Sequence, residues 1–410
     1  MISFCKNVFY VKGYINACLY DLNYRRLYQI QKREIAFINK ILTRSLSDID
    51  LSLEEKEAVC RLQQLGIIED SSNINMGHPC QLYTPSIKHA WIEVTKQCNH
   101  QCIHCYDESS PYIHTPMTMG DFRHAIDEVQ KADIRSIQLI GREPLCVGDM
   151  LKSMIDYSFG KFQSIELFTN GTLINSDWIN FFKKYSVKLA ISIHSYIPEM
   201  HDYVTRVHGS FARAKDNIRR IKESNIQYRV ANVLMNGVEI GDCDTDLFIL
   251  DKNRDVVRMS GRGSNIMLLN KDLLRKRMIS KKSFESALRP EFVRLAFSFN
   301  RCFCSKIYID TTLNVFPCVM ERRVAHGNIK NDTLESILRQ DLFVLNKDKV
   351  KVCSSCEFRY VCRDCRPDSF SEDIYAKPWY CTYNPITGQW EDEEDFFARI
   401  LSKKQNRPIT

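Results

Sequence analysis

The sequence Cys98-Asn-His-Gln-Cys102-Ile-His-Cys105 places three cysteines within eight residues, directly after a short apolar segment from Ala90 to Thr95. Closely spaced thiolates are ligands for iron–sulfur clusters. Three cysteines leave one iron of a four-iron cluster without a protein ligand, and that iron can chelate a small molecule through its amine and carboxylate. A three-cysteine zinc site and unrelated loop cysteines are the alternative interpretations.

The chain around this loop alternates between two kinds of segment. Short apolar stretches typical of strands are separated, in most cases, by amphipathic patterns typical of helices. Repeated strand–helix units predict a parallel sheet with right-handed crossovers, and the chemistry of such folds lies in loops at the carboxyl ends of the strands. The strand-like segments are 90–95, 136–140, 164–169, 188–193, 227–234 and 255–259, and the helical patterns cover 122–131, 150–159, 177–184 and 211–223.

The cysteine spacing, and its place after the first strand, resemble the radical S-adenosylmethionine (SAM) enzymes. This resemblance implies an α/β fold, with a partial (β/α)6 TIM-like radical SAM barrel over residues 87–269. It implies that Cys98, Cys102 and Cys105 bind a 4Fe-4S cluster, whose open iron takes SAM. It also implies that the ring of His104 packs beside the adenine, with a packed loop histidine as the equal alternative.

A second motif, Gly141-Arg-Glu-Pro144, follows the second predicted strand. The family has Gly-Gly-Glu-Pro at this place. The resemblance implies that Gly141 lets the backbone approach SAM closely and that Glu143 pairs with the SAM ammonium. Arg142 departs from the pattern. It either points outward and leaves the cofactor site open, or pairs with Glu143 and competes with SAM.

Two further strand ends carry polar residues that the resemblance assigns to SAM. Asn170 belongs to Thr169-Asn-Gly-Thr172, which follows the third strand and resembles the family's polar strand-end motif. A plain turn is the alternative, because Asn-Gly is a strong turn signal. Ser192 ends the fourth strand and resembles the serine that bonds the SAM carboxylate or ribose.

The C-terminal third of the chain is rich in cysteine. Eight cysteines lie between residues 302 and 381, enough for two more four-iron clusters with four thiolates each. Two zinc ribbons are the alternative, since C-x2-C pairs also serve zinc. The order resembles the SPASM extension of radical SAM maturases, which implies one auxiliary cluster on Cys302, Cys304, Cys318 and Cys365 and another on Cys353, Cys356, Cys362 and Cys381. Because Cys302 lies only two residues before Cys304, a three-cysteine cluster with Cys302 free is also open.

The N-terminal residues 1–86 predict a small separate unit. Strand-like segments at 4–11 and 14–20 precede helical patterns at 29–44 and 53–65, the second opened by a capping box of Ser52 and Glu55. Strands followed by a helix pair resemble the winged-helix-like peptide-recognition domain of enzymes that modify ribosomal peptides, where a leader peptide adds to an open sheet edge. A capping domain without a ligand is the alternative.

The composition of the chain limits the classes of protein to which it can belong. The 410 residues are 44% hydrophobic and 26% charged, with a net charge of +7, which is ordinary for a globular protein of more than one domain. No basic and aromatic residues interleave as a nucleic-acid groove requires, and no signal peptide or apolar run of membrane length is found. Seventeen cysteines without a secretion signal predict metal ligation in a reducing cytoplasm.

Two C-terminal stretches narrow the family further. Cys353-Ser-Ser-Cys-Glu-Phe-Arg-Tyr-Val-Cys-Arg-Asp-Cys365 and Lys377-Pro-Trp-Tyr-Cys-Thr-Tyr-Asn-Pro385 resemble SPASM peptide maturases of the grasp-with-spasm type. The expected domains are thus an N-terminal recognition domain, the barrel, a helical bridge at 270–300, a SPASM domain at 301–390 and a tail at 391–410.

The resemblance implies an enzyme that generates a 5′-deoxyadenosyl radical and abstracts hydrogen from a ribosomally synthesised precursor peptide, installing a cross-link or another modification. Its expected partners are the precursor peptide, an ATP-grasp ligase of the same pathway and a reductant such as ferredoxin or flavodoxin. A peptide-binding iron–sulfur scaffold for the ligase and a maturase of a folded protein are the alternatives. No residue in the sequence identifies the general base or the product linkage.

Overall fold

The computed structural model describes residues 2–42, 51–70, 86–250, 255–300, 302–340, 343 and 345–402. Its centre is an eight-stranded sheet in the order β10-β9-β8-β7-β6-β13-β14-β15. The six strands from β10 to β13 run parallel, and β14 and β15 complete the sheet antiparallel. The bounds are β6 His89–Glu93, β7 Ser136–Ile140, β8 Ser164–Thr169, β9 Lys188–Ser192, β10 Tyr228–Ala231, β13 Lys306–Ile309, β14 Asn314–Phe316 and β15 Gly327–Asn328. The predicted α/β fold is confirmed.

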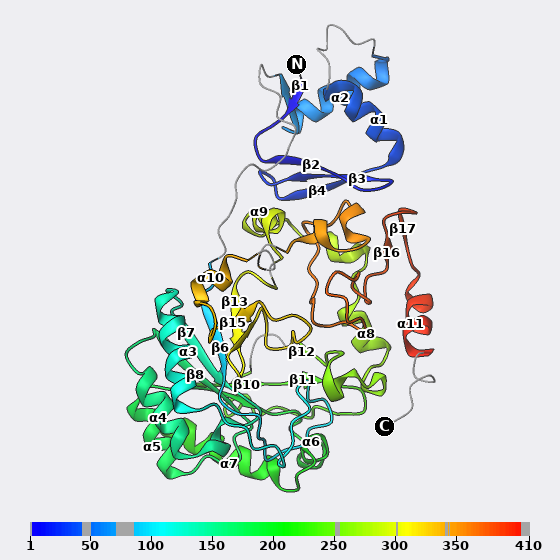
Figure 1. Cartoon of the computed structure of the whole chain (residues 1–410). Helices are drawn as coiled ribbons and strands as arrows, with labels where there is room; N and C mark the ends of the chain where they lie inside the picture. Colours follow the sequence, from blue (N-terminus) through cyan, green and yellow to red (C-terminus); the bar gives the residue numbers. More distant parts are fainter. Residues whose placement is uncertain are drawn as a thin grey trace.

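Helices cover one face of this sheet (Figure 1). Alternation along β6 sends Ala90 and Ile92 toward the helices, where both are fully buried. The other face lines the barrel interior, where the indole of Trp91 donates to Gln138, Gln138 donates to Glu166, and Arg229 pairs with Glu166 at 2.8 Å. The bounds are α3 Met119–Lys131, α4 Asp149–Ser158, α5 Ser176–Lys184, α6 Pro198–Thr205 and α7 Ser210–Glu223.

The sixth predicted strand, 255–259, does not join the central sheet. It forms only β12 (Asp255–Val256), which pairs parallel with β11 (Val233–Leu234) in a separate two-stranded sheet. The predicted segment 227–234 is divided at Asn232, whose side-chain amide donates to the carbonyl of Ile193 at 2.8 Å. The edge of the central sheet beside β6 is instead taken by β13, from the cysteine-rich region.

The N-terminal unit contains two small sheets and two helices. β1 (Ile2–Phe4) pairs with β5 (Ile68–Asp70), and β2 (Val8–Lys12), β3 (Ala17–Asp21) and β4 (Arg26–Ile30) form an antiparallel sheet. α1 (Lys32–Leu42) and α2 (Leu53–Gln64) pack on one face of this sheet, and the predicted capping box of α2 is present. The predicted helix 29–44 starts too early, since residues 29 and 30 end β4. Its last two residues, and residues 71–85 of the predicted domain, lie outside the described ranges.

The other face of the N-terminal sheet rests on the cysteine-rich region (Figure 1). Phe9 and Tyr20 are buried there against Phe358 and Tyr383. The Tyr20 hydroxyl donates to the carbonyl of Glu357 at 2.5 Å. Shared burial therefore joins the first and last thirds of the chain.

The C-terminal third consists mostly of loops and short helices around the cysteines. Its elements are α8 Lys271–Arg277, α9 Pro290–Ser298, α10 Leu334–Leu338, α11 Glu393–Leu401, β16 Tyr383–Asn384 and β17 Gln389–Trp390. Residues 403–410 of the predicted tail lie outside the described part. Among the described residues, none of the helices has the length and apolarity that a membrane span requires.

Candidate functional site

The cysteine loop follows the carboxyl end of β6, where the sequence predicted the chemistry to lie. Two of its sulfurs accept backbone hydrogen bonds, Cys98 from His100 at 3.3 Å and Cys105 from Ser109 at 3.4 Å. Burial, and then the neighbouring sulfur of Cys105, raises the pKa of Cys102 to about 12. Burial also raises the pKa of Cys98, and thiols that resist ionisation alone need bound cations to hold their negative charge. This donor set fits an iron–sulfur cluster.

A second loop, which contains Arg262, holds the cysteine loop through hydrogen bonds. The sequence analysis did not predict this loop as part of the site. Arg262 donates from its backbone to the carbonyl of Cys105 at 2.9 Å and from its side chain to the carbonyl of Cys102 at 2.8 Å. Gly261 has φ +50°, and a Cβ there would lie 2.6 Å from the same Cys105 carbonyl. The signal was Gly261-Arg-Gly263, a tripeptide that allows such close backbone contact.

Glu143 is a fully buried carboxylate at the carboxyl end of β7. It accepts hydrogen bonds from the backbone of Asn170 at 2.7 Å, from the hydroxyl of Thr169 at 2.7 Å and from the backbone of Leu145 at 3.1 Å. Burial raises the pKa of Glu143 to about 7. No cationic side chain of the described residues pairs with it, so the ammonium of a ligand would complete its surroundings.

Gly141 allows the chain to reach this position. Its φ is +155°, and a Cβ would lie 2.6 Å from the carbonyl of Thr95, at the start of the cysteine loop. A side chain at residue 141 would therefore push the motif away from the loop that follows β6.

Arg142 points away from Glu143. Its Nε lies 3.2 Å from a carboxylate oxygen of Asp107, and its Nη1 donates to the carbonyl of Lys96 at 2.7 Å. Arg322 approaches the same carboxylate at 3.8 Å. Of the two interpretations left open for Arg142, the geometry matches the one in which it leaves the Glu143 carboxylate accessible to a cofactor.

His104 belongs to a cluster of buried histidine rings. It meets His194 edge to face at 4.4 Å, and His194 stacks on His201 at 5.6 Å. Burial lowers the pKa of His104 and of His201 to about 4, so the rings are neutral near pH 7. The ring of His104 is therefore an uncharged aromatic group next to the third cysteine, which is compatible with packing against a nucleobase.

Asn170 and Ser192 lie at the next strand ends. The Asn170 amide donates to the side-chain oxygen of Asn99, inside the cysteine loop, at 2.7 Å. Ser192 is the last residue of β9 and follows Ile191, which pairs with Thr169 of β8. Four neighbouring parallel strands thus deliver the cysteine loop, Glu143, Asn170 and Ser192 to one edge of the sheet.

The structure brings together part of the first set of cysteines that was predicted to hold an auxiliary cluster. The Cys302 thiol is within hydrogen-bond distance of Cys318 and Cys365, and its donation lowers the pKa of both. The nearby guanidinium of Arg258 lowers the pKa of Cys365 further. Cys302 therefore lies with Cys318 and Cys365, two other members of its set, and Cys304 is buried.

The second predicted auxiliary set lines one small cavity, formed by Cys353, Cys356, Cys362 and Cys381 together with Lys347. The buried Lys347 lies with its Nζ 3.9 Å from the sulfur of Cys362 and 2.6 Å from Asp364. Four thiols around one enclosed space fit a four-thiolate cluster. Across the described residues, no three cysteine, histidine or acidic side chains lie close enough together to hold a single metal ion.

Comparison with known proteins identifies the barrel. A family model described as the radical SAM superfamily matches residues 92–248. These residues form a radical SAM domain. The match includes the cysteine loop, Glu143, Asn170 and Ser192, so the resemblance inferred from the sequence is confirmed for this part of the chain.

Individual relatives match shorter or more distant stretches. The subtilosin biosynthesis protein AlbA of Bacillus subtilis is 27% identical over 138 residues, 32% of this chain and 31% of the relative. The chain spans about a third of the length of the curated relatives it matches.

Solved structures with the same fold cover far more of the chain. SuiB of Streptococcus suis, bound to its precursor peptide SuiA, has a TM-score of 0.51 at 11% identity and covers 91% of this chain and 99% of its own. The structure of anSMEcpe with bound AdoMet has a TM-score of 0.51 at 15% identity, covering 78% and 100%. These likenesses extend the shared fold beyond the barrel.

Proposed function

We propose that this protein is a radical SAM enzyme that modifies a ribosomally synthesised precursor peptide. With SAM on the 4Fe-4S cluster, the site would supply a 5′-deoxyadenosyl radical that abstracts a hydrogen atom from the peptide. The outcome is a cross-link or another oxidative change. The similarity to AlbA and SuiB supports a peptide as the substrate.

The observation that carries this proposal is the arrangement at the strand ends. A loop with three cysteines, of which Cys98 is buried, follows β6, and a buried carboxylate without a cationic partner among the described residues follows β7. The backbone of Glu143 donates to the carbonyl of Gln97, next to Cys98, at 2.9 Å, which supports a position of this motif close to the first cysteine. A ligand bound to the cluster through its amine and carboxylate would thus reach Glu143.

The protein's own residues would bind SAM, orient it and exclude water from the site. Glu143 would hold the SAM ammonium, and Gly141 would let the backbone close around it. The neutral ring of His104 would pack beside the adenine, while Asn170 fixes the cysteine loop through Asn99. Ser192 would meet the carboxylate or ribose.

The C-terminal cysteines would hold two auxiliary 4Fe-4S clusters, in the two sets described above. Their closeness to the N-terminal unit supports a path for the peptide from that unit toward the barrel. We propose that the N-terminal unit binds the leader, that a ferredoxin or flavodoxin delivers electrons in the cytoplasm, and that an ATP-grasp ligase acts in the same pathway.

The test is an anaerobic reconstitution with iron and sulfide. About twelve irons per chain are expected from three clusters of four. Addition of dithionite and SAM should then release 5′-deoxyadenosine, detected by mass spectrometry. A C98A/C102A/C105A variant should lose about four irons and all deoxyadenosine. Zinc in place of iron, or deoxyadenosine formed equally by this variant, would refute the proposal.

A further inference from the structure

The turn between β2 and β3 of the N-terminal unit meets the segment 353–359, which carries two cysteines of the second auxiliary set and is called the Cys353 loop below. The backbone of Tyr14 donates to the carbonyl of Ser355 at 2.8 Å. A Cβ on Gly13 would lie 2.5 Å from a carboxylate oxygen of Glu357 and 2.9 Å from its backbone nitrogen. Only glycine lets the two backbones approach this closely.

Glu357, the residue after Cys356, receives further contacts around the same junction. The hydroxyl of Tyr20 on β3 donates to its carbonyl at 2.5 Å. The Glu357 side chain is fully buried and accepts from the hydroxyl of Tyr383 at 2.5 Å and from the amide of Gln29 on β4 at 3.5 Å. The N-terminal unit thus fixes the residue that directly follows a predicted cluster ligand.

Arg359 connects the β2–β3 turn to the cavity of the second auxiliary set. Its Nη1 donates to the carbonyl of Lys12 at 2.7 Å and to the carbonyl of Cys356 at 2.9 Å. Its Nε pairs with Asp348 at 2.8 Å, and its side chain is one of those that line the cavity. A displacement of the turn would therefore also displace part of the cavity wall.

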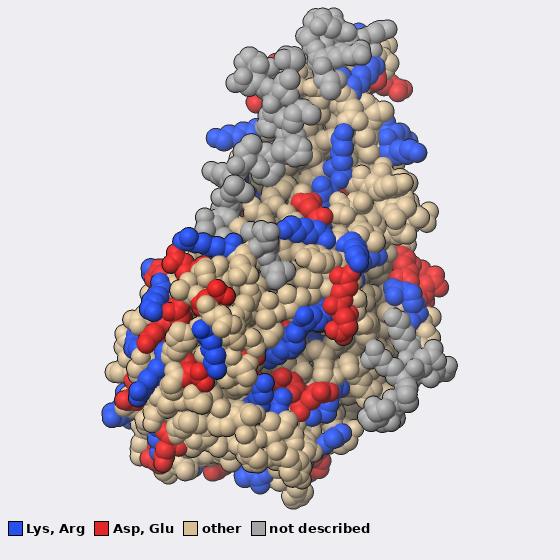
Figure 2. Space-filling model, in the orientation of Figure 1, with Lys and Arg blue, Asp and Glu red and all other residues tan. Residues whose placement is uncertain are grey.

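Apolar packing covers the same side of the second set. Two of its cysteines, Cys356 and Cys381, pack against a group of buried side chains that includes Phe9, Cys18 and Tyr20 of the N-terminal sheet. Cys18 and Tyr20 have no exposed surface. Atoms of the two parts of the chain are in contact in the space-filling view (Figure 2). The N-terminal sheet therefore keeps solvent from this side of the four cysteines.

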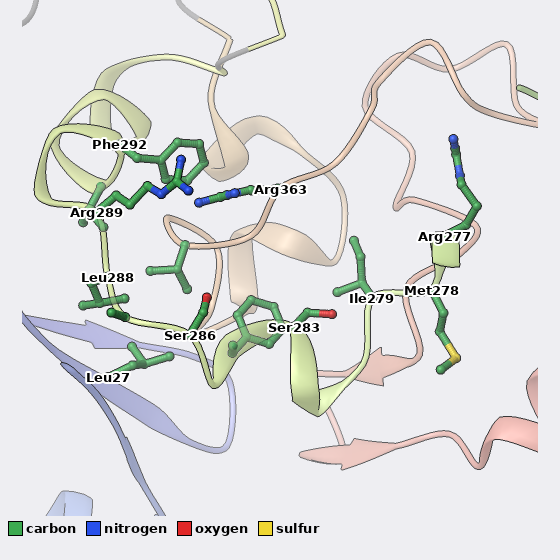
Figure 3. Close-up of a pocket in the computed structure, with 14 residues that line it drawn as sticks. Leu27, Arg277, Met278, Ile279, Ser283, Ser286, Leu288, Arg289, Phe292 and Arg363 are labelled. Atoms are coloured by element: carbon green, nitrogen blue, oxygen red, sulfur yellow. The ribbon is translucent and has the colours of Figure 1, made fainter. Parts of the chain in front are cut away.

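The opposite end of the N-terminal sheet is attached to the helical bridge. The backbone of Leu288 donates to the carbonyl of Arg25 at 2.8 Å, and the guanidinium of Arg294 donates to the side-chain oxygen of Asn7 at 2.6 Å. Figure 3 shows the side chains of Leu27 and Leu288 next to one another beside a hollow that both residues line. Both ends of the sheet are thus attached to the C-terminal third of the chain.

We propose that the N-terminal unit is a cover for the second auxiliary cluster, and that the docked unit and the cluster stabilise each other. The inference rests on the second cluster of the proposed function and goes beyond it, because it gives the N-terminal unit a role that needs no bound peptide. The gathered thiolates would hold the Cys353 loop in the shape that receives the β2–β3 turn. Since coupling between two sites is reciprocal, each partner should protect the other.

The first experiment measures iron release from the anaerobically reconstituted full-length protein, with bathophenanthroline disulfonate as a coloured ferrous chelator. Y20F removes the buried hydrogen bond to Glu357 and should release about four irons per chain roughly tenfold faster than the wild type. Y10F is the matched control. Tyr10 is buried on the other face of the same sheet, and its hydroxyl has no hydrogen-bond partner among the described residues, so its release should equal that of the wild type.

G13A tests the close approach of the turn. Its Cβ would collide with the backbone of Glu357, so iron release should be faster still than in Y20F. G120A is the control, since a Cβ there would lie 3.8 Å from the nearest atom. If G13A does not fold, Y20F alone decides the result.

The second experiment reverses the direction of the coupling. C362S removes a ligand of the second cluster, and Cys362 packs with a different group of buried side chains from the N-terminal contact. Cys18, which is fully buried in that contact, should then react several-fold faster with N-ethylmaleimide than in the wild type. The exposed Cys60 should react equally in both proteins. Peptide mass spectrometry measures the labelling of each cysteine.

Iron release from Y20F at the wild-type rate, or unchanged labelling of Cys18 in C362S, would overturn the inference while the proposed clusters stand. A wild type that binds only about eight irons, with no difference from C362S, would refute the second cluster itself and the inference with it. The iron content of the wild type therefore distinguishes the two failures.

Discussion

Replacing Arg142 by alanine separates the two roles that the sequence left open for this residue. The Arg142–Asp107 pair is mostly buried, with side-chain exposures of 11% and 21%, and the guanidinium also bonds a carbonyl. Hydrogen bonds to charged groups are worth about 1.5–3 kcal/mol each, and burial of the charges cancels part of this gain. Since Arg322 remains near Asp107, we expect R142A to cost about 2 kcal/mol, which lowers the thermal midpoint of a 410-residue chain by roughly 2–3 °C.

The same variant should bind SAM as the wild type does, within about threefold, because the removed side chain does not touch Glu143. Anaerobic calorimetry on the cluster-loaded protein measures this. Had Arg142 competed for Glu143, its removal would release about 2 kcal/mol and tighten SAM binding about thirtyfold. Tightening of that size would refute the reasoning. R135A is the matched control, since Arg135 pairs with Asp133 at a similar 3.3 Å but with exposures of 62% and 81%. It should have little effect on either quantity.

Three other predictions follow from buried charges and buried rings. E143Q should keep its iron content but bind SAM about 10- to 100-fold more weakly in the same calorimetry, because a charge-assisted bond to the ammonium is lost; wild-type affinity would contradict the assignment. K347M should lower the reduction potential of one auxiliary cluster by roughly 40 mV in an EPR titration, because it removes a positive charge beside the cysteines. The expected change is small because Asp364 cancels most of the lysine charge. K351M, which removes a mostly exposed lysine, should change nothing. Burial lowers the pKa of His326 to about 3, so the folded protein should lose about 1 kcal/mol between pH 7 and 5.5, as the unfolded chain gains the proton. H326F should abolish this component, which thermal midpoints at both pH values would reveal as a smaller shift than in the wild type.

Local sequence patterns were sufficient to predict much of the barrel fold. The cysteine spacing, the strand–helix alternation and the motif around Glu143 each lie in a short stretch, so periodicity and spacing revealed them. The prediction for the sixth strand was wrong, because the apolar pattern of a segment does not indicate which sheet it joins. The same limit hid β13, whose residues Ile307 and Ile309 are buried in the central sheet although they come from the cysteine-rich region.

In the candidate site, too, local motifs were predicted from the sequence and long-range contacts were not. The sequence predicted Glu143 and the cysteines as site residues, but it did not predict Arg262 or Lys347, which contact Cys102 and Cys362 from distant segments. An arginine or lysine carries no local signal of its partner, since long-range contacts depend on how the chain packs.

The sequence by itself predicted the ligand types, and it determined the alternation of strands and helices along most of the barrel and the family of the domain, because these depend on residues close together in the chain. Only the tertiary structure decided that Arg142 turns to Asp107 and that four cysteines share one cavity with Lys347. Each of these depends on groups brought together from distant parts of the chain, and burial there fixes which charges find partners.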